Sequence, residues 1–208
     1  CKPSIPYIIN NGSAAVVKDG YLWEDFMNPL YLKEAILKAD SMGMSVIMST
    51  GKDELVYKYN SYIQKNIDKY GRYNHFYIPL ESEWPDLRLQ KVLIVDDEDK
   101  NRIDEIIKII LPYKDELNIL KYNDRSVDVS PKSADKSLAV RRLAKIMSVN
   151  MEDVMTIGDS LNDTEMIREA GIGVASYTAV EEVKKVAKVV CKRPLSGGVL
   201  DLLKEIYQ

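Results

Sequence analysis

The sequence has few cysteines, a single histidine and no long apolar run, which excludes several classes of protein. Its 208 residues include two cysteines, Cys1 and Cys191, which are too few for a disulfide framework, so reduced thiols are expected. His75 is the single histidine, and no set of partners for a histidine-based nucleophilic triad accompanies it. A surface or packed position is therefore favoured for His75. No apolar run approaches the length of a membrane span, and no charged-then-apolar signal peptide opens the chain. These features predict a cytoplasmic protein with no membrane partner.

The charge is also unremarkable in sign and distribution. The formal net charge is −3, with 46% hydrophobic and 29% charged residues, which is ordinary globular composition. No polybasic run is present, which argues against nucleic acid as a partner. The length allows one large core or two modest domains.

The most informative stretch is residues 154–167, which read VMTIGDSLNDTEMI. Apolar and β-branched residues run into Gly158, and a helical pattern follows, so we expect a buried strand, a tight turn and a helix start. Asp159, Asn162 and Asp163 crowd that turn. In open α/β sheets the carboxyl ends of the strands face the ligand crevice, and carboxylate and amide oxygens suit Mg²⁺. A helix-capping cluster is the alternative, since Asp and Asn are favoured caps.

The rest of the chain alternates helical and strand patterns. Strands are predicted at residues 5–9, 14–17, 21–23, 44–49, 91–95, 117–122, 126–129, 172–175 and 189–190. Helices are predicted at residues 29–42, 55–70, 102–111, 179–187 and 199–206, with a further helix beginning near Lys136. Residues 71–89 are expected to be an irregular connection. The acidic run at residues 96–99 is expected to be a solvated turn that caps the following helix rather than a metal site.

Lys136 is a second candidate for chemistry. It is predicted in the first turn of a helix, where a cation is electrostatically misplaced because the helix amino end is already positive. The placement is explained if the lysine and the helix amino end bind the same anion, since helix amino ends bind phosphate. A solvated lysine is the alternative, and Lys132 is the second choice for the same role.

Three segments together resemble one family. The run Gly158-Asp159-Ser160-Leu161-Asn162-Asp163 resembles the fourth signature motif, G-D-x-x-N-D, of haloacid dehalogenase-like phosphatases of the Cof-type branch. Lys136 and its neighbours resemble the third motif of that family, and Asn11-Gly12 resembles its "NG" loop.

The resemblance implies an α/β fold, with a Rossmann-like parallel-sheet core and an inserted α/β cap domain. The implied core is discontinuous, comprising residues 1–17 and 124–208, and the cap comprises residues 18–123. The implied metal ligands for Mg²⁺ are Asp159 and Asp163. Lys136 is the implied catalytic residue, and Asn11, Lys136 and Asn162 are the implied phosphate-binding residues.

The family's first and second motifs do not occur in the sequence. Members begin with a strand ending in D-x-D, whose first Asp is the nucleophile, and Asp97-Glu98-Asp99 lacks the continuation that this motif requires. We therefore expect the amino-terminal part of the core to be missing and the chain alone to be inactive. The implied function of the intact protein is Mg²⁺-dependent hydrolysis of a small phosphorylated metabolite, such as a sugar phosphate, through an aspartyl-phosphate. The alternative is a catalytically inactive relative that binds phosphate or a partner.

Overall fold

A computed structural model describes residues 5–71, 75–98, 101–122 and 124–207. Its internal contacts divide the chain into two compact units, Cys1–Ala134 and Asp135–Gln208. Cys1 and Asp99, which entered the sequence predictions, lie outside the described residues.

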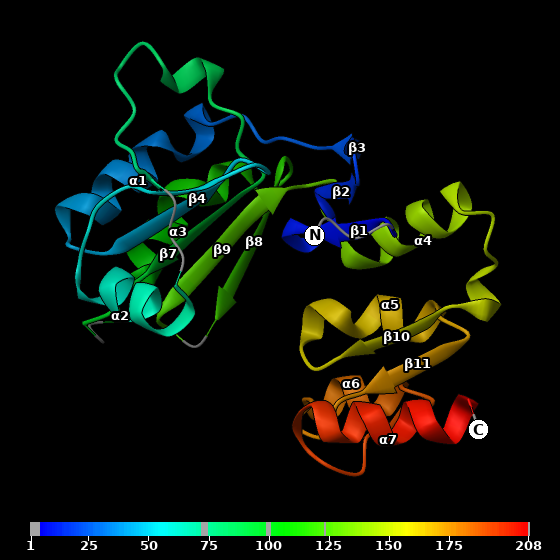
Figure 1. Cartoon of the computed structure of the whole chain (residues 1–208). Coiled ribbons are helices and arrows are strands. Elements are labelled where there is room, and N and C mark those ends of the chain that lie inside the picture. Colours follow the sequence, from blue (N-terminus) through cyan, green and yellow to red (C-terminus); the bar gives the residue numbers. More distant parts are fainter. Residues whose placement is uncertain (1–4, 72–74, 99–100, 123, 208) are drawn as a thin grey trace. The chain divides into compact units, whose positions relative to one another are not determined.

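The first unit contains two sheets (Figure 1). An antiparallel three-stranded sheet has the order β1-β2-β3, formed by β1 (Tyr7–Ile9), β2 (Ala14–Val17) and β3 (Gly20–Glu24). A six-stranded sheet has the order β6-β5-β4-β7-β9-β8. Its strands are β4 (Ser45–Ser49), β5 (Glu54–Val56), β6 (His75–Phe76), β7 (Lys91–Val95), β8 (Leu117–Tyr122) and β9 (Ser126–Pro131). The pairings are antiparallel except between β5 and β6.

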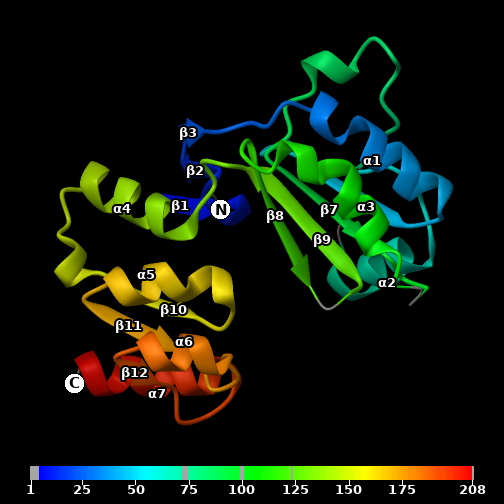
Figure 2. The same ribbon diagram turned by 180° about the vertical axis from the view of Figure 1, so that it is seen from behind.

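Helices α1 (Leu30–Ser41) and α3 (Ile103–Ile110) pack on one face of the six-stranded sheet (Figures 1 and 2). Leu32, Ile36 and Ala39 recur at helical spacing in α1 and are each 0% exposed, so the apolar face of the predicted helix is the buried one. Helix α2 (Ser61–Tyr70) packs on the opposite face of this sheet, where Ile63 contacts a smaller cluster that includes Ile47 of β4. Side chains of a strand alternate between the two faces, so Ile47 points away from α1.

Three predictions for this unit are wrong in part. Residues 71–89, predicted to be an irregular connection, contain β6, which pairs with β5, and a 3-10 turn at Trp84–Asp86. The helix predicted over residues 55–70 begins at Ser61, because residues 54–56 form β5 and the Asn60 side chain caps the helix by accepting a hydrogen bond from the amide of Ile63. The turn after β7 is not solvated at Asp96, which is 1% exposed. The predicted capping of the next helix is also wrong, because α3 has no side-chain cap hydrogen bond; Asp96 instead accepts hydrogen bonds from the backbone amide and the guanidinium of Arg102, the residue that precedes the helix.

The second unit is a parallel α/β layer. Strands β10 (Met155–Gly158), β11 (Ile172–Ala175) and β12 (Val189–Val190) form a parallel sheet in that order. Helices α5 (Thr164–Glu169) and α6 (Glu181–Val186) share a cluster with Ala175 on one face, and α7 (Leu195–Tyr207) packs on the other around Val174 and Leu202. Helix α4 (Lys136–Ile146) precedes this layer and packs against α5.

The α/β class with a parallel sheet is therefore confirmed. The predicted division into a discontinuous core and an inserted cap stays a prediction: β9 pairs with β7 and β8, and the boundary between the compact units falls after Ala134. Within the described residues, no helix is long and apolar enough to cross a membrane.

Candidate functional site

The candidate site is built on the turn that joins β10 to α5. Strand β10 ends at Gly158, and a short 3-10 turn, Leu161–Asp163, leads into α5. Ser160 and Asp163 form a capping box, in which each side chain hydrogen-bonds the backbone amide of the other residue. The turn is thus held by its own sequence, and it stands at the carboxyl end of a parallel strand, where α/β sheets place their ligands.

Asp163 is the most heavily engaged side chain of this turn. It is 3% exposed, and its Oδ2 accepts hydrogen bonds from the backbone amides of Asp159 at 3.0 Å and Ser160 at 3.1 Å. Its Oδ1 accepts from the Lys136 ammonium at 2.6 Å. Both carboxylate oxygens are therefore occupied, one by the main chain and one by a cation.

Gly158 is required by this close approach. A Cβ atom built on Gly158 would lie 2.3 Å from the Cβ and 2.6 Å from the Cγ of Asp163. Those distances are well inside van der Waals contact, so a side chain at position 158 would push Asp163 away from the turn. The glycine and the buried carboxylate are structurally linked.

Asp159 differs from Asp163 in being exposed. Its side chain accepts one hydrogen bond, from the Ser160 hydroxyl to Oδ1 at 3.3 Å. Its backbone oxygen accepts from the amide of Val180 at 3.0 Å, and the preceding Gly158 oxygen accepts from Ser176 at 2.8 Å. The main chain of the turn is thereby bound to the loop after β11, while the Asp159 carboxylate remains accessible to solvent.

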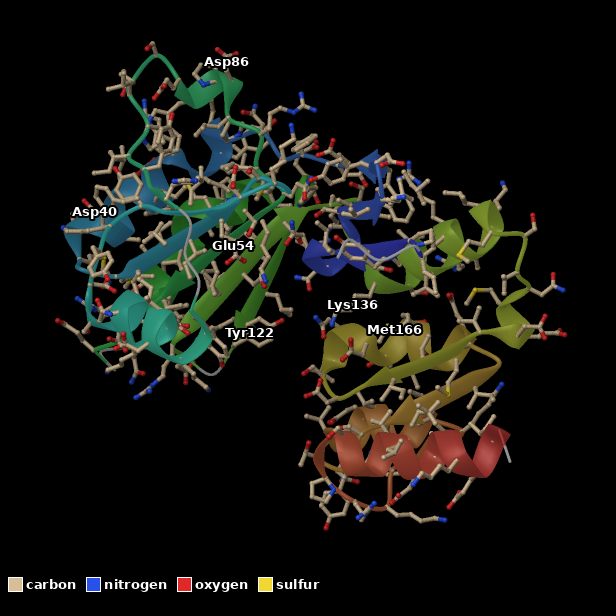
Figure 3. All side chains as sticks on the ribbon, viewed as in Figure 1. Asp40, Glu54, Asp86, Tyr122, Lys136 and Met166 are labelled. Atoms are coloured by element: carbon tan, nitrogen blue, oxygen red, sulfur yellow. The ribbon has the colours of Figure 1, made fainter. Side chains whose placement is uncertain are left out.

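Lys136 is the first residue of α4. Asp135 caps this helix, its carboxylate accepting from the amide of Leu138 at 2.8 Å. The Lys136 side chain, labelled in Figure 3, is 30% exposed, and its ammonium pairs with Asp163 in the turn before α5. The ammonium is therefore at the motif and not directed into bulk solvent, as expected from its unfavourable place at a helix amino end. Lys132 instead donates to the backbone oxygen of Lys114 at 3.1 Å.

The structure thus brings together four of the five predicted site residues. Lys136, Asp159, Asn162 and Asp163 lie at or beside the β10–α5 turn of the second unit. Asn11 belongs to the first unit, where its side-chain amide donates to Asp128 Oδ2 at 3.4 Å. The arrangement combines an exposed carboxylate with a cation held by a buried one, a combination suited to a phosphate group and a divalent metal.

Comparison with known proteins identifies the family of the chain. A family model described as haloacid dehalogenase-like hydrolase matches residues 2–203 of the chain. The chain belongs to this hydrolase family. The resemblance inferred from the β10–α5 motif is therefore confirmed over nearly the whole sequence.

Relatives with described activities support the assignment. Phosphatase YwpJ of Bacillus subtilis is 32% identical over 94 residues, which are 45% of this chain and 33% of that protein. The 5-amino-6-(5-phospho-D-ribitylamino)uracil phosphatase YcsE of the same species is 34% identical over 104 residues, 50% of this chain and 41% of that protein. The matched regions therefore span well under half of each of these curated relatives.

Solved structures show the same fold. A haloacid dehalogenase-like hydrolase from Bacteroides thetaiotaomicron has a TM-score of 0.80 at 22% identity, covering 95% of this chain and 74% of that one. The sugar phosphatase BT4131 has a TM-score of 0.76 at 22% identity, covering 97% of this chain and 75% of that one.

The residues of this hydrolase turn fit a magnesium site only in part. Mg²⁺ is usually bound through one or two carboxylates together with waters and substrate phosphate. Among the described residues, no group of three or more His, Cys, Asp or Glu side chains is arranged to hold a metal ion. Asp159 is exposed and fits the role of direct ligand. Asp163 is 3% exposed and both of its oxygens already accept hydrogen bonds, so its role as a metal ligand stays a prediction.

The sequence left helix capping as an alternative for this turn, but the pairing of Ser160 with Asp163 was not predicted. The capping box could have been found, because a Ser followed three residues later by an acid is its known pattern. The contact between Asn11 and Asp128 had no such signal, since these residues are 117 positions apart.

Proposed function

We propose that the protein is a Mg²⁺-dependent phosphomonoester hydrolase of the haloacid dehalogenase-like family. The observation that carries the proposal is the contact between Lys136 and Asp163, beside an exposed Asp159 at the carboxyl end of a parallel strand. Membership of the hydrolase family and the phosphatase relatives support it.

We base the proposed roles on the family resemblance and on the contacts of the turn. Asp159 would hold Mg²⁺, and the bound ion would supply positive charge to stabilise the phosphoryl group during transfer. Lys136, held by Asp163, stabilises the same developing negative charge from the protein side, and Asn162 orients the phosphate. Asp163 has a positioning role: it binds the backbone amide of Asp159 and holds the Lys136 ammonium in place.

The covalent step requires one further group. A carboxylate oxygen attacks phosphorus, the ester bond to the leaving alcohol breaks, and water then releases inorganic phosphate from the aspartyl-phosphate. We assign the nucleophile to no residue of these 208, so the proposal concerns a protein that supplies it. The alternative proposal, a non-catalytic phosphate- or partner-binding relative, follows if no nucleophile is supplied.

For the substrate we propose a small phosphorylated metabolite such as a sugar phosphate, handled in the cytoplasm. The support is the chemistry of the relatives, one a phosphatase of a phosphorylated ribitylamino compound and one a sugar phosphatase. An exposed single-carboxylate site also suits a ligand that brings its own phosphate oxygens to the metal.

The test is phosphate release with Mg²⁺ from an aryl phosphate and several sugar phosphates. It uses this chain and the same protein extended at its amino end. We expect turnover only by the extended protein, and Asp159→Asn and Lys136→Ala should each lower its kcat/KM by about 100-fold or more. Lys132→Ala is the matched control and should leave activity unchanged.

Turnover by the extended protein that survives both Asp159→Asn and Lys136→Ala would contradict the proposed site. Phosphate binding without turnover by either form would support the non-catalytic alternative.

A further inference from the structure

Helices α4 and α5 of the second unit lie side by side and are bonded at both ends of α5 (Figures 1 and 2). At the amino end, Asp163 accepts a hydrogen bond from Lys136 at 2.6 Å. At the carboxyl end, Glu169 is the last residue of α5, and both of its carboxylate oxygens contact α4. The first contact belongs to the β10–α5 turn, whereas the second lies at the opposite end of the helix.

Glu169 binds two residues that are one turn apart on α4. Its Oε2 accepts from the Ser137 hydroxyl, and its Oε1 accepts from the Arg141 guanidinium at 2.7 Å. Residues four apart lie on the same face of a helix, so a single carboxylate can reach both. Ser137 is 3% exposed, whereas the Arg141 side chain is 45% exposed. The buried Ser137 bond is therefore the stronger restraint, because solvent screens the exposed ion pair.

Ser137 directly follows Lys136 in the chain, and this couples the two ends of α5. Consecutive side chains project about 100° apart around an α-helix, so these two residues can reach in different directions. Their partners, Asp163 and Glu169, are separated by about 9 Å along the helix axis. Two contacts that far apart fix the rotation of α4 about its own axis, which a single contact leaves free.

The Lys136 side chain needs a restraint of this kind. A lysine ammonium is a point charge on a flexible four-carbon stem, so its position depends on where the helix places the start of that stem. The side chain is also 30% exposed, and water therefore competes with Asp163 for the ammonium. The Asp135 cap fixes the backbone of this turn within α4, and Glu169 fixes the same turn relative to α5.

We propose that Glu169 is a positioning residue that sets the rotation of α4 and thereby holds the Lys136 ammonium on Asp163. The catalytic meaning of this inference rests on the proposed function, in which Lys136 stabilises the transferred phosphoryl group. Glu169 acts only through Lys136 and contacts neither phosphate nor metal. A purely stabilising role for Glu169 predicts a less stable second unit in which the contact between Lys136 and Asp163 is unchanged.

The experiment compares the full chain with Glu169→Ala, Glu169→Gln and Ser137→Ala by NMR, without any ligand. Glu165→Ala is the matched control, because Glu165 is an acid of the same helix whose ion pair with Arg168 stays within α5. Lys136→Ala identifies the Lys136 ammonium signal by its loss. Urea unfolding of the same samples records the stability of each variant separately.

The first readout is the rate at which the Lys136 ammonium protons exchange with water, which is slow only while the ammonium is hydrogen-bonded. We expect Glu169→Ala and Ser137→Ala to raise this rate by about threefold to tenfold, the range that one hydrogen bond contributes to an equilibrium. Glu169→Gln keeps an acceptor oxygen for Ser137, so the increase should be smaller, and Glu165→Ala should leave the rate unchanged.

Unchanged exchange in both Glu169→Ala and Ser137→Ala would overturn the inference, even if both chains are less stable. If Glu169→Ala does not fold, Ser137→Ala decides in the same way, because alanine is well tolerated within a helix.

The second readout is turnover of an aryl phosphate with Mg²⁺ by the protein extended at its amino end. We expect Glu169→Ala to lower kcat by about threefold to tenfold without changing KM, because Lys136 acts on charge that develops in the transition state. In a Lys136→Ala background the same substitution should change kcat by less than about 1.5-fold, since the two residues act as a unit. An equal loss in both backgrounds would overturn the positioning role.

The two readouts separate this inference from the proposed function. If the extended protein shows no turnover, the proposed function is wrong, and the exchange of the ammonium protons still decides whether Glu169 positions Lys136. If turnover is found and the exchange rates are unchanged, the proposed function stands and the inference about Glu169 is wrong.

Discussion

The strongest test of the site compares Asp159→Asn with Asp163→Asn. The two carboxylates belong to one short motif, and the resemblance assigned both to the metal. The structure gives them different surroundings, because Asp159 is exposed whereas Asp163 is 3% exposed and bound through both oxygens. We expect Asp159→Asn to remove Mg²⁺ binding with little effect on stability, and Asp163→Asn to destabilise the second unit.

The magnitude follows from the three hydrogen bonds that the Asp163 carboxylate accepts, from Lys136 and from the amides of Asp159 and Ser160. Each hydrogen bond to a charged group contributes about 1.5–3 kcal/mol, and these contributions are not additive. An asparagine of the same shape keeps one acceptor oxygen, so its NH₂ group must face either the ammonium or the amides. We expect the unfolding free energy of the second unit to fall by about 2–4 kcal/mol. Asp159→Asn changes an exposed side chain, and its effect should stay within about 0.5 kcal/mol.

The assay must report on the second unit alone. Both tryptophans, Trp23 and Trp84, lie in the first unit, so their fluorescence does not follow unfolding around β10. Urea unfolding followed through the backbone amide signals of β11 does so, because β11 is the central strand of the parallel sheet. Mg²⁺ titration of the same samples measures metal binding independently.

If the unfolding free energy of the second unit in Asp163→Asn stays within about 0.5 kcal/mol of the parent value, the structural role of Asp163 is refuted. Unimpaired Mg²⁺ binding by Asp159→Asn would refute its role as the direct ligand.

Three further outcomes are expected. Gly158→Ala should destabilise the second unit by about 1–3 kcal/mol, because its Cβ would lie 2.3 Å from the Asp163 Cβ; urea unfolding measures this, and an unchanged midpoint would contradict it. Asp96 accepts from the Arg102 guanidinium, which holds the pKa of that carboxyl below its usual value, so its stabilising contribution is present above about pH 4 and is lost as the pH falls through the lowered pKa. The stability difference between the parent and Asp96→Asn, followed by tryptophan fluorescence, should therefore shrink below about pH 4, and a difference independent of pH would exclude this linkage. Asn60→Ala should lower stability by about 1 kcal/mol through loss of the cap on α2, with Asn66→Ala, inside the same helix, as a comparison expected to cost less.

Much of the fold could be predicted because local signals and tertiary structure agree. The periodic apolar residues of α1 are the buried ones, and the Asp19-Gly20 turn does join two strands. The prediction for residues 55–70 was wrong because Leu55 and Val56 fit a helical period and also a strand. Pairing with β4 decides between the two, and that pairing is not visible in local sequence.

The residues of the site could be predicted from the sequence, but their individual contacts could not. The motif placed Asp159, Asn162 and Asp163 in one turn, and the dipole argument placed Lys136 toward an anion. The resemblance placed the Lys136 ammonium near Asp159 or Asp163, and the sequence could not tell that the contact would be with Asp163, 27 positions away. Nor could it separate the two carboxylates, because their difference lies in which of them reaches the backbone amides of the turn.

Asp163 binds the main chain at position 159 and not its side chain. This hydrogen bond therefore does not depend on the side chain at position 159. It requires a backbone N–H there, which proline lacks. Position 159 is accordingly open to redesign. Glutamate, histidine or cysteine could be introduced there to change metal preference toward larger or softer ions, on a scaffold that does not need to be rebuilt.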